Sequence, residues 1–81
     1  MMHPDQIKQL ILAGLACDHL ELDGDGHHFE ALVVSREFAG MNRVQRQQRV
    51  YRTLSDKLAT GELHALSFKT LTPEEWSATR G

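Results

Sequence analysis

Hydrophobic residues follow a helical period in the first part of the chain. Ile7, Leu10, Ile11 and Leu15 are spaced by three or four residues, which predicts an amphipathic helix over about residues 4–16. Such a helix needs a partner for its apolar face, and strands that follow it in the chain would supply one.

Two strands are predicted next. Leu20 and Leu22 alternate with polar neighbours, as on a strand with one buried face. The sequence Asp23-Gly-Asp-Gly26 predicts a tight turn, because glycine adopts positive φ without steric cost. Residues 29–34 are nearly all apolar, which predicts a central strand buried on both faces.

The second half of the chain predicts a helix, a strand and a short last helix. Apolar spacing indicates a helix over about residues 43–59, with Gly61 just beyond its end. Residues 64–71 alternate as in a strand, with Leu66 and Phe68 on one side. Thr72-Pro-Glu-Glu75 has the pattern of a capping box, so the last helix is expected to place Trp76 against the core. The inward face of the second helix is expected to comprise Val44, Gln47, Val50, Tyr51, Leu54 and Leu58.

These elements predict one small α+β domain over residues 1–81, in the order α-β-β-α-β-α. The short turn makes the first two strands antiparallel, whereas a helix links the second and third, which favours a parallel pair with a right-handed crossover. We expect a three-stranded mixed sheet with helices on one side.

Composition limits the function classes. The 81 residues carry a formal net charge of −2, which argues against general attraction to nucleic acid or to anionic membranes. No apolar run approaches the ~20 residues of a membrane span, and no signal peptide is recognisable, so a cytoplasmic protein is expected. The lone Cys17 excludes an internal disulfide and is expected to be a small, partly buried hydrophobe. No catalytic motif is present, so we do not expect an enzyme.

Histidines are the candidate metal ligands. His27 and His28 end the glycine-rich turn, and His64 begins the third strand. A parallel register would bring these segments to one edge of the sheet, and two imidazoles can replace two cysteines on one iron of a [2Fe–2S] cluster. The alternative is a solvated turn and an ordinary histidine at a strand end. A partner would have to supply the remaining ligands. His3 and His19 are expected to be exposed.

Arginines recur every third residue of the second helix. Arg43, Arg46, Arg49 and Arg52 would wind around about half of the helix and make a broad basic surface. Such a surface attracts phosphates, acidic side chains or the carboxylates of glutathione. A solvated helix face without a ligand remains the alternative.

Two stretches of the chain, Phe38–Leu54 and His64–Trp76, resemble the signature of the BolA family, small stress-linked proteins of the iron–sulfur system. The pair Gln47-Gln48 is similar to the YrbA/IbaG-type branch. The resemblance covers nearly the whole chain and implies a BolA-like fold, similar to the class II KH topology.

The resemblance also implies a function. BolA proteins share a [2Fe–2S] cluster with a monothiol glutaredoxin and its glutathione, with ligands at the position of His64 and in the first hairpin loop, here His28 or His27. No cluster is expected in the isolated chain. The contact surface would include the arginines of the second helix. It would also include the third strand with Lys69.

Two other functions remain open. Family members are linked to transcription, so the basic helix, through Arg46 and Arg49, is a candidate surface for DNA. KH domains, however, clamp nucleic acid with a Gly-x-x-Gly loop, and Gly40-Met-Asn-Arg43 lacks the second glycine. The third candidate is an interaction domain that uses an exposed sheet edge and no metal. The sequence leaves open whether a homodimer forms, and which target or stress the protein serves.

Overall fold

The structure, a computed structural model, describes residues 3–24, 28–60 and 66–80. The predicted order of elements is confirmed, except that the second helix is interrupted and a short 3-10 helix, η1, precedes it. The elements are α1 (Pro4–Gly14), β1 (His19–Gly24), β2 (Phe29–Val34), η1 (Arg36–Phe38), α2 (Arg43–Thr53), α3 (Ser55–Ala59), β3 (Leu66–Leu71) and α4 (Pro73–Arg80).

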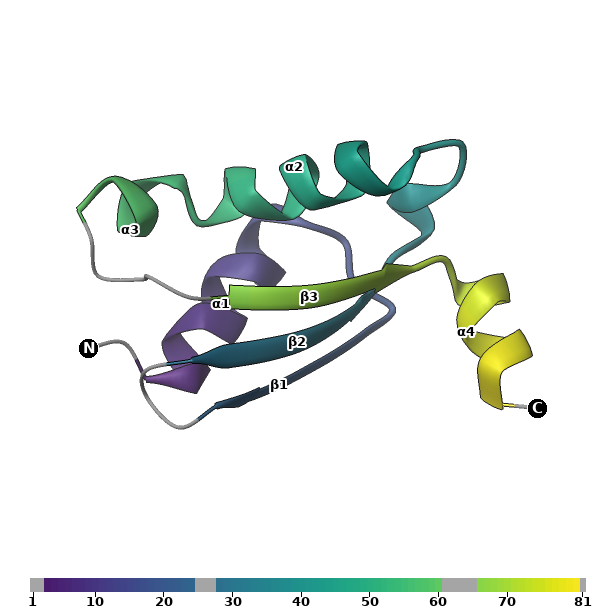
Figure 1. Cartoon of the computed structure of the whole chain (residues 1–81), viewed down its shortest axis with the longest axis horizontal. Helices are drawn as coiled ribbons and strands as arrows, with labels where there is room; N and C mark the ends of the chain where they lie inside the picture. Colours follow the sequence, from purple (N-terminus) through teal and green to yellow (C-terminus); the bar gives the residue numbers. More distant parts are fainter. Residues whose placement is uncertain (1–2, 25–27, 61–65, 81) are drawn as a thin grey trace.

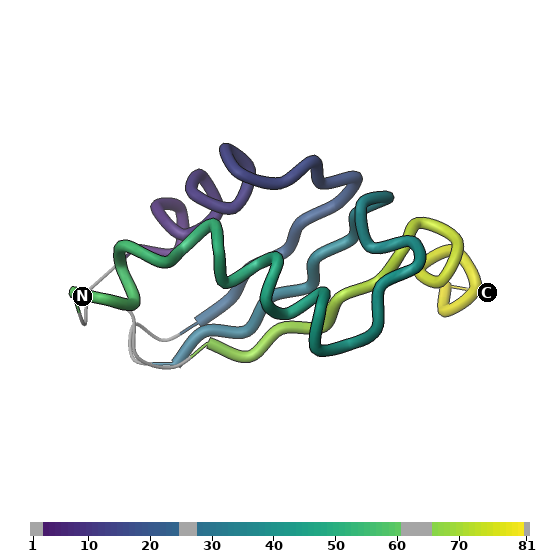
Figure 2. Tube along the Cα trace, turned by 90° about the horizontal axis from the view of Figure 1, so that it is seen from above, coloured from purple at the N-terminus to yellow at the C-terminus, as the bar shows by residue number. Residues whose placement is uncertain are grey.

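A three-stranded mixed sheet forms one layer of the molecule, in the order β1-β2-β3. β1 pairs antiparallel with β2, and β2 pairs parallel with β3, as predicted. Helices α1 and α2 lie across the same face of the sheet, α1 on the side of β1 and α2 above β3 (Figures 1 and 2). The short α4 follows β3 at the far end of the sheet (Figure 1).

The hydrophobic core lies between the sheet and these two helices. Side chains alternate along a strand, so one face of β2 presents Phe29, Ala31 and Val33 to the helices. The helices contribute fully buried residues at the predicted spacing. The buried core cluster consists of Ile7, Ile11, Leu15, Phe29, Ala31, Val33, Phe38, Val50 and Leu54.

Capping boxes fix the starts of α2 and α4. Asn42 accepts a hydrogen bond from the Gln45 backbone N–H, and the Gln45 side chain accepts one from the Asn42 N–H. The predicted box at α4 is confirmed, because Glu75 accepts from the Thr72 N–H at 2.8 Å and donates its own N–H to the Thr72 hydroxyl. Gly40 takes a φ of +81° in the loop before α2, a conformation that favours glycine.

The predicted second helix is broken at Leu54, whose φ of −115° and ψ of 8° lie outside the helical range. The chain resumes as α3 at Ser55, without a side-chain cap. The predicted inward face is right for Val50 and Leu54 but wrong for Val44, which is 61% exposed. Tyr51 is also exposed, and its ring lies edge-on to that of Phe68. Arg46 of the same helix is instead directed towards the body of the domain, with a side chain only 13% exposed.

The outer face of the sheet departs from two further predictions. β2 is buried on both faces only towards its end, since Val34 is fully buried but Glu30 is exposed. Trp76 does not join the core. Its ring stacks on His19, which alternates with core-facing Leu20 and so lies on the opposite face of the sheet. The helices that build the core therefore lie on one side, and α4 reaches the other.

Within the described ranges, none of the helices combines the length and the apolar character that crossing a bilayer requires.

Candidate functional site

The beginnings of β2 and β3 meet at one rim of the sheet. In the parallel ladder Phe29 is opposite Leu66, so the two strands start side by side and run in the same direction. This register is the one predicted from the β2–helix–β3 order. It places the first residues of β2 and of β3 side by side.

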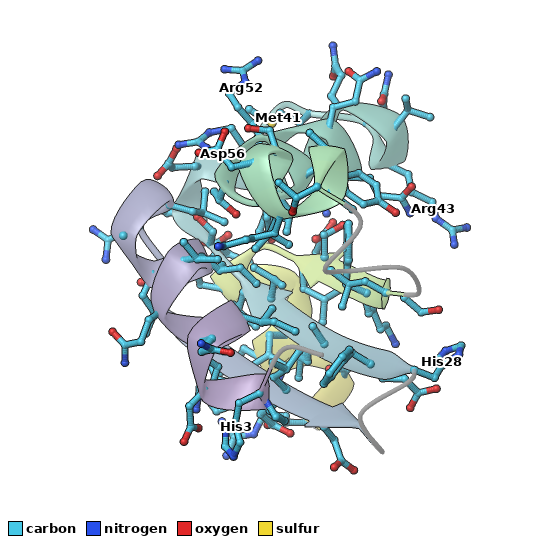
Figure 3. The ribbon with its side chains drawn as sticks, turned by 90° about the vertical axis from the view of Figure 1, so that its left-hand side faces the viewer. His3, His28, Met41, Arg43, Arg52 and Asp56 are labelled. Atoms are coloured by element: carbon cyan, nitrogen blue, oxygen red, sulfur yellow. The ribbon has the colours of Figure 1, made fainter. Side chains whose placement is uncertain are left out.

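His28 is the candidate ligand that the structure describes. It directly precedes Phe29, is exposed, and projects outward on the side away from α1 (Figure 3). The other two candidates, His27 and His64, lie outside the described residues, as do Gly61 and the second half of the predicted turn, Asp25 and Gly26. Within residues 3–24, 28–60 and 66–80, no three His, Cys, Asp or Glu side chains gather as a metal site would require. A site built on His28 therefore needs ligands from the remaining segments or from another molecule.

Gly24 determines how closely the hairpin closes next to His28. It pairs with Phe29, and a Cβ added there would lie 2.5 Å from Phe29 Cδ1 and 2.6 Å from the His28 carbonyl oxygen. These distances are shorter than real Cβ atoms tolerate, and the second obstacle is backbone. The glycine is thus needed for this close approach, and it positions the start of β2.

Arg46 belongs to an internal polar network rather than to a free basic surface. Its Nη1 contacts Glu75 Oε1 at 2.7 Å and donates to the Thr70 carbonyl at 3.2 Å, and its Nε donates to the Met41 carbonyl. The side chain is only 13% exposed. The hydrogen bonds from Arg46, followed by that from the Thr72 N–H, lower the pKa of Glu75 from 4.5 to about 2.

Arg49 is likewise engaged within the domain. Its Nη2 donates to the Gly14 carbonyl at 2.8 Å and to Glu37 Oε1 at 3.0 Å. Glu37 also accepts the Ala16 backbone N–H, and this hydrogen bond is the main cause that lowers the pKa of its carboxyl, with Arg49 adding to it. The end of α1, the segment after it and η1 are thereby joined to α2.

The remaining predicted cations are differently placed. Arg43, Arg52 and Lys69 are exposed and make no ion pair with the carboxylates that the structure describes. Figure 3 shows Arg43 directed to the side of the molecule and Arg52 directed away from the sheet. The four arginines of α2 therefore do not form the broad, continuous basic surface expected from their spacing.

An aromatic stack on the outer face was not anticipated. The rings of His19 and Trp76 are nearly parallel, with centroids 4.3 Å apart, and the Arg80 guanidinium lies 4.4 Å from the Trp76 ring centroid. His19 also contacts Glu21. His19 is therefore half-buried rather than fully exposed as expected, because Trp76 of α4 stacks on its ring. The four-residue spacing of Trp76 and Arg80 on a helix was the signal available in the sequence.

The other sequence candidates have structural roles. His3 is exposed, as expected, and its ring nitrogen accepts the Asp5 backbone N–H at the start of α1. Cys17 is half-buried against the core, as expected, and burial is the main cause that raises the pKa of its thiol, with Glu37 next. A raised thiol pKa opposes thiolate formation, so Cys17 is a weak candidate for a metal ligand.

Comparison with known proteins finds members of one family, the BolA-like proteins. The family model BolA, described as BolA-like protein, matches residues 13–75. The acid stress protein IbaG of Escherichia coli is 37% identical over 79 residues, which cover 98% of this chain and 94% of that protein. The DNA-binding transcriptional regulator BolA of Haemophilus influenzae is 42% identical over 55 residues, which cover 68% of this chain and 52% of that protein.

A solved structure confirms the fold. The bol-like protein from Babesia bovis superposes with a TM-score of 0.87 at 26% identity, covering 100% of this chain and 96% of that one. The family model matches most of the chain, and IbaG matches almost all of it. The chain therefore belongs to the family of BolA-like proteins.

Proposed function

We propose that the protein is an adaptor in iron–sulfur metabolism, which binds a monothiol glutaredoxin and shares a [2Fe–2S] cluster with it. His64 supplies one ligand, and His28 or His27 supplies the other. The observation that carries this proposal is the parallel register of Phe29 with Leu66, which starts β2 and β3 at the same rim.

Chain geometry supports the pairing of ligands. His28 adjoins Phe29, and His64 precedes Leu66 by two residues. Consecutive Cα atoms are about 3.8 Å apart, so each histidine is within two virtual bonds of a residue in the paired ladder. An exposed imidazole at this rim is accessible to a metal centre held by a partner.

The chemistry of two imidazoles suits a shared cluster. Two histidines can ligate one iron of a [2Fe–2S] cluster, and the other ligands are then thiolates that a glutaredoxin and glutathione supply. Neutral imidazole is a weaker charge donor than thiolate, so a change of ligand set alters the reduction potential and how readily a cluster leaves. In this proposal the protein modulates cluster transfer or iron sensing and performs no catalysis, in accord with the stress-related name of IbaG.

The test is to mix the purified protein with a cluster-loaded monothiol glutaredoxin and to follow visible absorption and circular dichroism. The wild-type protein should change the spectrum, and His64→Ala should abolish the change. Comparing His27→Ala with His28→Ala identifies the second ligand. His3→Asn is the matched control, because asparagine can also cap a helix and His3 lies at the start of α1. A His64→Ala spectrum identical to that of the wild type would refute the ligand assignment.

We also consider binding of DNA, which the name of the Haemophilus influenzae relative, DNA-binding transcriptional regulator BolA, favours. Arg46 and Arg49 are unsuitable positions for testing DNA binding, because replacing either one would also break an internal ion pair. Arg43→Ala and Arg52→Ala are cleaner variants, because both side chains are exposed. A gel-shift titration at two salt concentrations should reveal salt-sensitive binding that both substitutions weaken. No retardation at low salt would exclude this function.

A further inference from the structure

β3 is an edge strand, and no other strand of the described residues pairs with its outer side. It pairs with β2 on one side and is last in the strand order. Two hydrogen bonds identify which backbone groups face outward. The Leu71 carbonyl accepts the Ser35 N–H on the β2 side, whereas the Thr70 carbonyl accepts Arg46 Nη1 on the other side.

Which backbone groups of β3 face outward follows from the alternation of residues along a strand. The N–H and C=O of one strand residue point to the same side, and the next residue points its groups to the opposite side. Phe68 shares the parity of Thr70, so its N–H and C=O face outward. Arg46 occupies only the Thr70 carbonyl, at the end of the strand. As far as the described residues show, the middle of β3 therefore retains a donor and an acceptor that an added strand would pair with.

An apolar wall stands above this edge. Val44 and Tyr51 are seven residues apart on α2 and share a helix face, and both are unusually exposed, at 61% and 38%. The Tyr51 ring lies edge-on to Phe68 with centroids 5.0 Å apart. A groove of about 750 Å³ runs along the edge, and its lining includes Met41, Arg43, Phe68 and Lys69.

The free charges at this groove are positive. Arg43 and Lys69 line it and are paired with none of the described carboxylates, whereas Glu75 in the same lining is neutralised by Arg46. Lys69 alternates with Phe68, so its side chain emerges on the outer face of the sheet, and Phe68 faces α2. Glu30 is the remaining acidic residue in the lining, and it belongs to β2 rather than to the edge.

We propose that this groove binds an extended segment of a partner protein, in which apolar and acidic residues alternate, as a fourth strand added to β3. Backbone pairing with Phe68 would supply affinity that does not depend on the partner's side chains, and apolar side chains would contact Val44 and Tyr51. Acidic side chains of the alternate positions would lie beside Lys69, and a terminal one beside Arg43. A second copy of the chain is disfavoured as occupant, because antiparallel pairing of two β3 edges would bring Lys69 close to its own counterpart.

The test uses the full chain, labelled with nitrogen-15, and a capped hexapeptide of alternating glutamate and valine. Titration should shift the amide resonances of Phe68, Thr70 and the Val44–Tyr51 face of α2. The matched peptide of alternating lysine and valine should bind at least about tenfold more weakly than the glutamate–valine peptide, because it opposes Lys69 and Arg43 with like charges. A glutamate–valine peptide methylated at alternate backbone nitrogens should also lose binding.

A charge exchange makes the test decisive. Lys69→Glu should reverse the preference, so that the lysine–valine peptide binds more tightly than the glutamate–valine peptide. Val44→Asp should weaken both, and folding is not at risk because Val44 is exposed. Absence of shifts at millimolar peptide, equal affinity for both peptides, or shifts outside the groove would overturn the proposal. Self-association through the edge, or competition by single-stranded DNA at lower concentration than the peptide, would also overturn it. No step requires iron or a glutaredoxin, so the result is independent of the proposed function.

Discussion

Arg46 on α2 and Glu75 on α4 are joined by a 2.7 Å ion pair, although 28 residues separate them in the chain. The same guanidinium binds the Thr70 carbonyl, so one side chain connects a helix start, a strand end and the last helix. Glu75 in turn accepts the Thr72 N–H. This contact explains why an arginine, and not the valine two residues before it, is directed towards the body of the domain.

Arg46→Ala should reduce the free energy of unfolding by about 1–3 kcal/mol, because a largely buried side chain that satisfies two backbone carbonyls is lost. Urea denaturation followed by far-UV circular dichroism measures the change. Arg43→Ala is the matched control on the same helix, and its effect should lie within about 0.5 kcal/mol since the side chain is exposed. Equal effects of the two substitutions would contradict the structural role of Arg46.

Stability should fall in acid through Glu75. Its pKa is lowered from 4.5 to about 2 in the folded protein, so the unfolded chain binds the proton more tightly. The contribution of this carboxylate is therefore complete above a pH of about 4.5 and is lost as the pH falls towards about 2. Glu75→Gln should flatten the loss of stability over this window, measured by urea denaturation at several pH values. Glu74→Gln, at the exposed neighbouring position, is the matched substitution and should retain the acid loss of stability that Glu75 causes.

Gly24→Ala should destabilise the hairpin by about 1–3 kcal/mol, because the added methyl group meets the His28 carbonyl and the Phe29 ring. The amide resonance of His28 should shift as the start of β2 is displaced. Gly14→Ala is a useful contrast. There the added carbon meets Thr53 Cγ2 at 2.8 Å and Thr53 Cβ at 3.2 Å, which are side-chain atoms, whereas at Gly24 a backbone carbonyl lies at 2.6 Å, and so the loss should be smaller. A larger loss for Gly14→Ala would contradict this interpretation.

His19→Ala should loosen α4. The stacked pair of His19 and Trp76 is expected to contribute about 0.5–1.5 kcal/mol beyond the area it buries. Trp76 is the only tryptophan of the chain, so the tryptophan emission reports on the surroundings of this one ring. The emission should shift to longer wavelength in His19→Ala as the indole becomes more exposed. His3→Asn should leave the emission unchanged, and an unaltered His19→Ala spectrum would argue against the stack.

Much of the fold follows from local patterns. The alternation of Leu66 with Phe68 and the spacing of Ile7 with Ile11 identify which faces are buried, because a strand and a helix each impose a fixed period. The capping box of Thr72 and Glu75 is equally local. These features need only neighbouring residues, and the structure bears them out.

The predictions from sequence were wrong where a polar partner far away in the chain determines the orientation of a side chain. Hydrophobicity alone directs Val44 inward, but Arg46 gains three acceptors from other elements by lying inward instead. Trp76 is the largest apolar residue of α4, yet the path of that helix presents it to the outer face. The same holds for the candidate site, where partners distant in the sequence also determine which side chains are engaged. The rim could be predicted from strand order, whereas the engagement of Arg46 and Arg49 required contacts across the whole domain.

The parallel ladder also has a consequence for folding. β1 and β2 are joined by a short connection, whereas pairing of β2 with β3 closes a longer loop that contains α2 and α3. We therefore expect the rim at Phe29 and Leu66 to assemble after the β1–β2 hairpin. A partly folded chain would display the hairpin without its neighbour, and any activity that depends on both segments is confined to the completed domain.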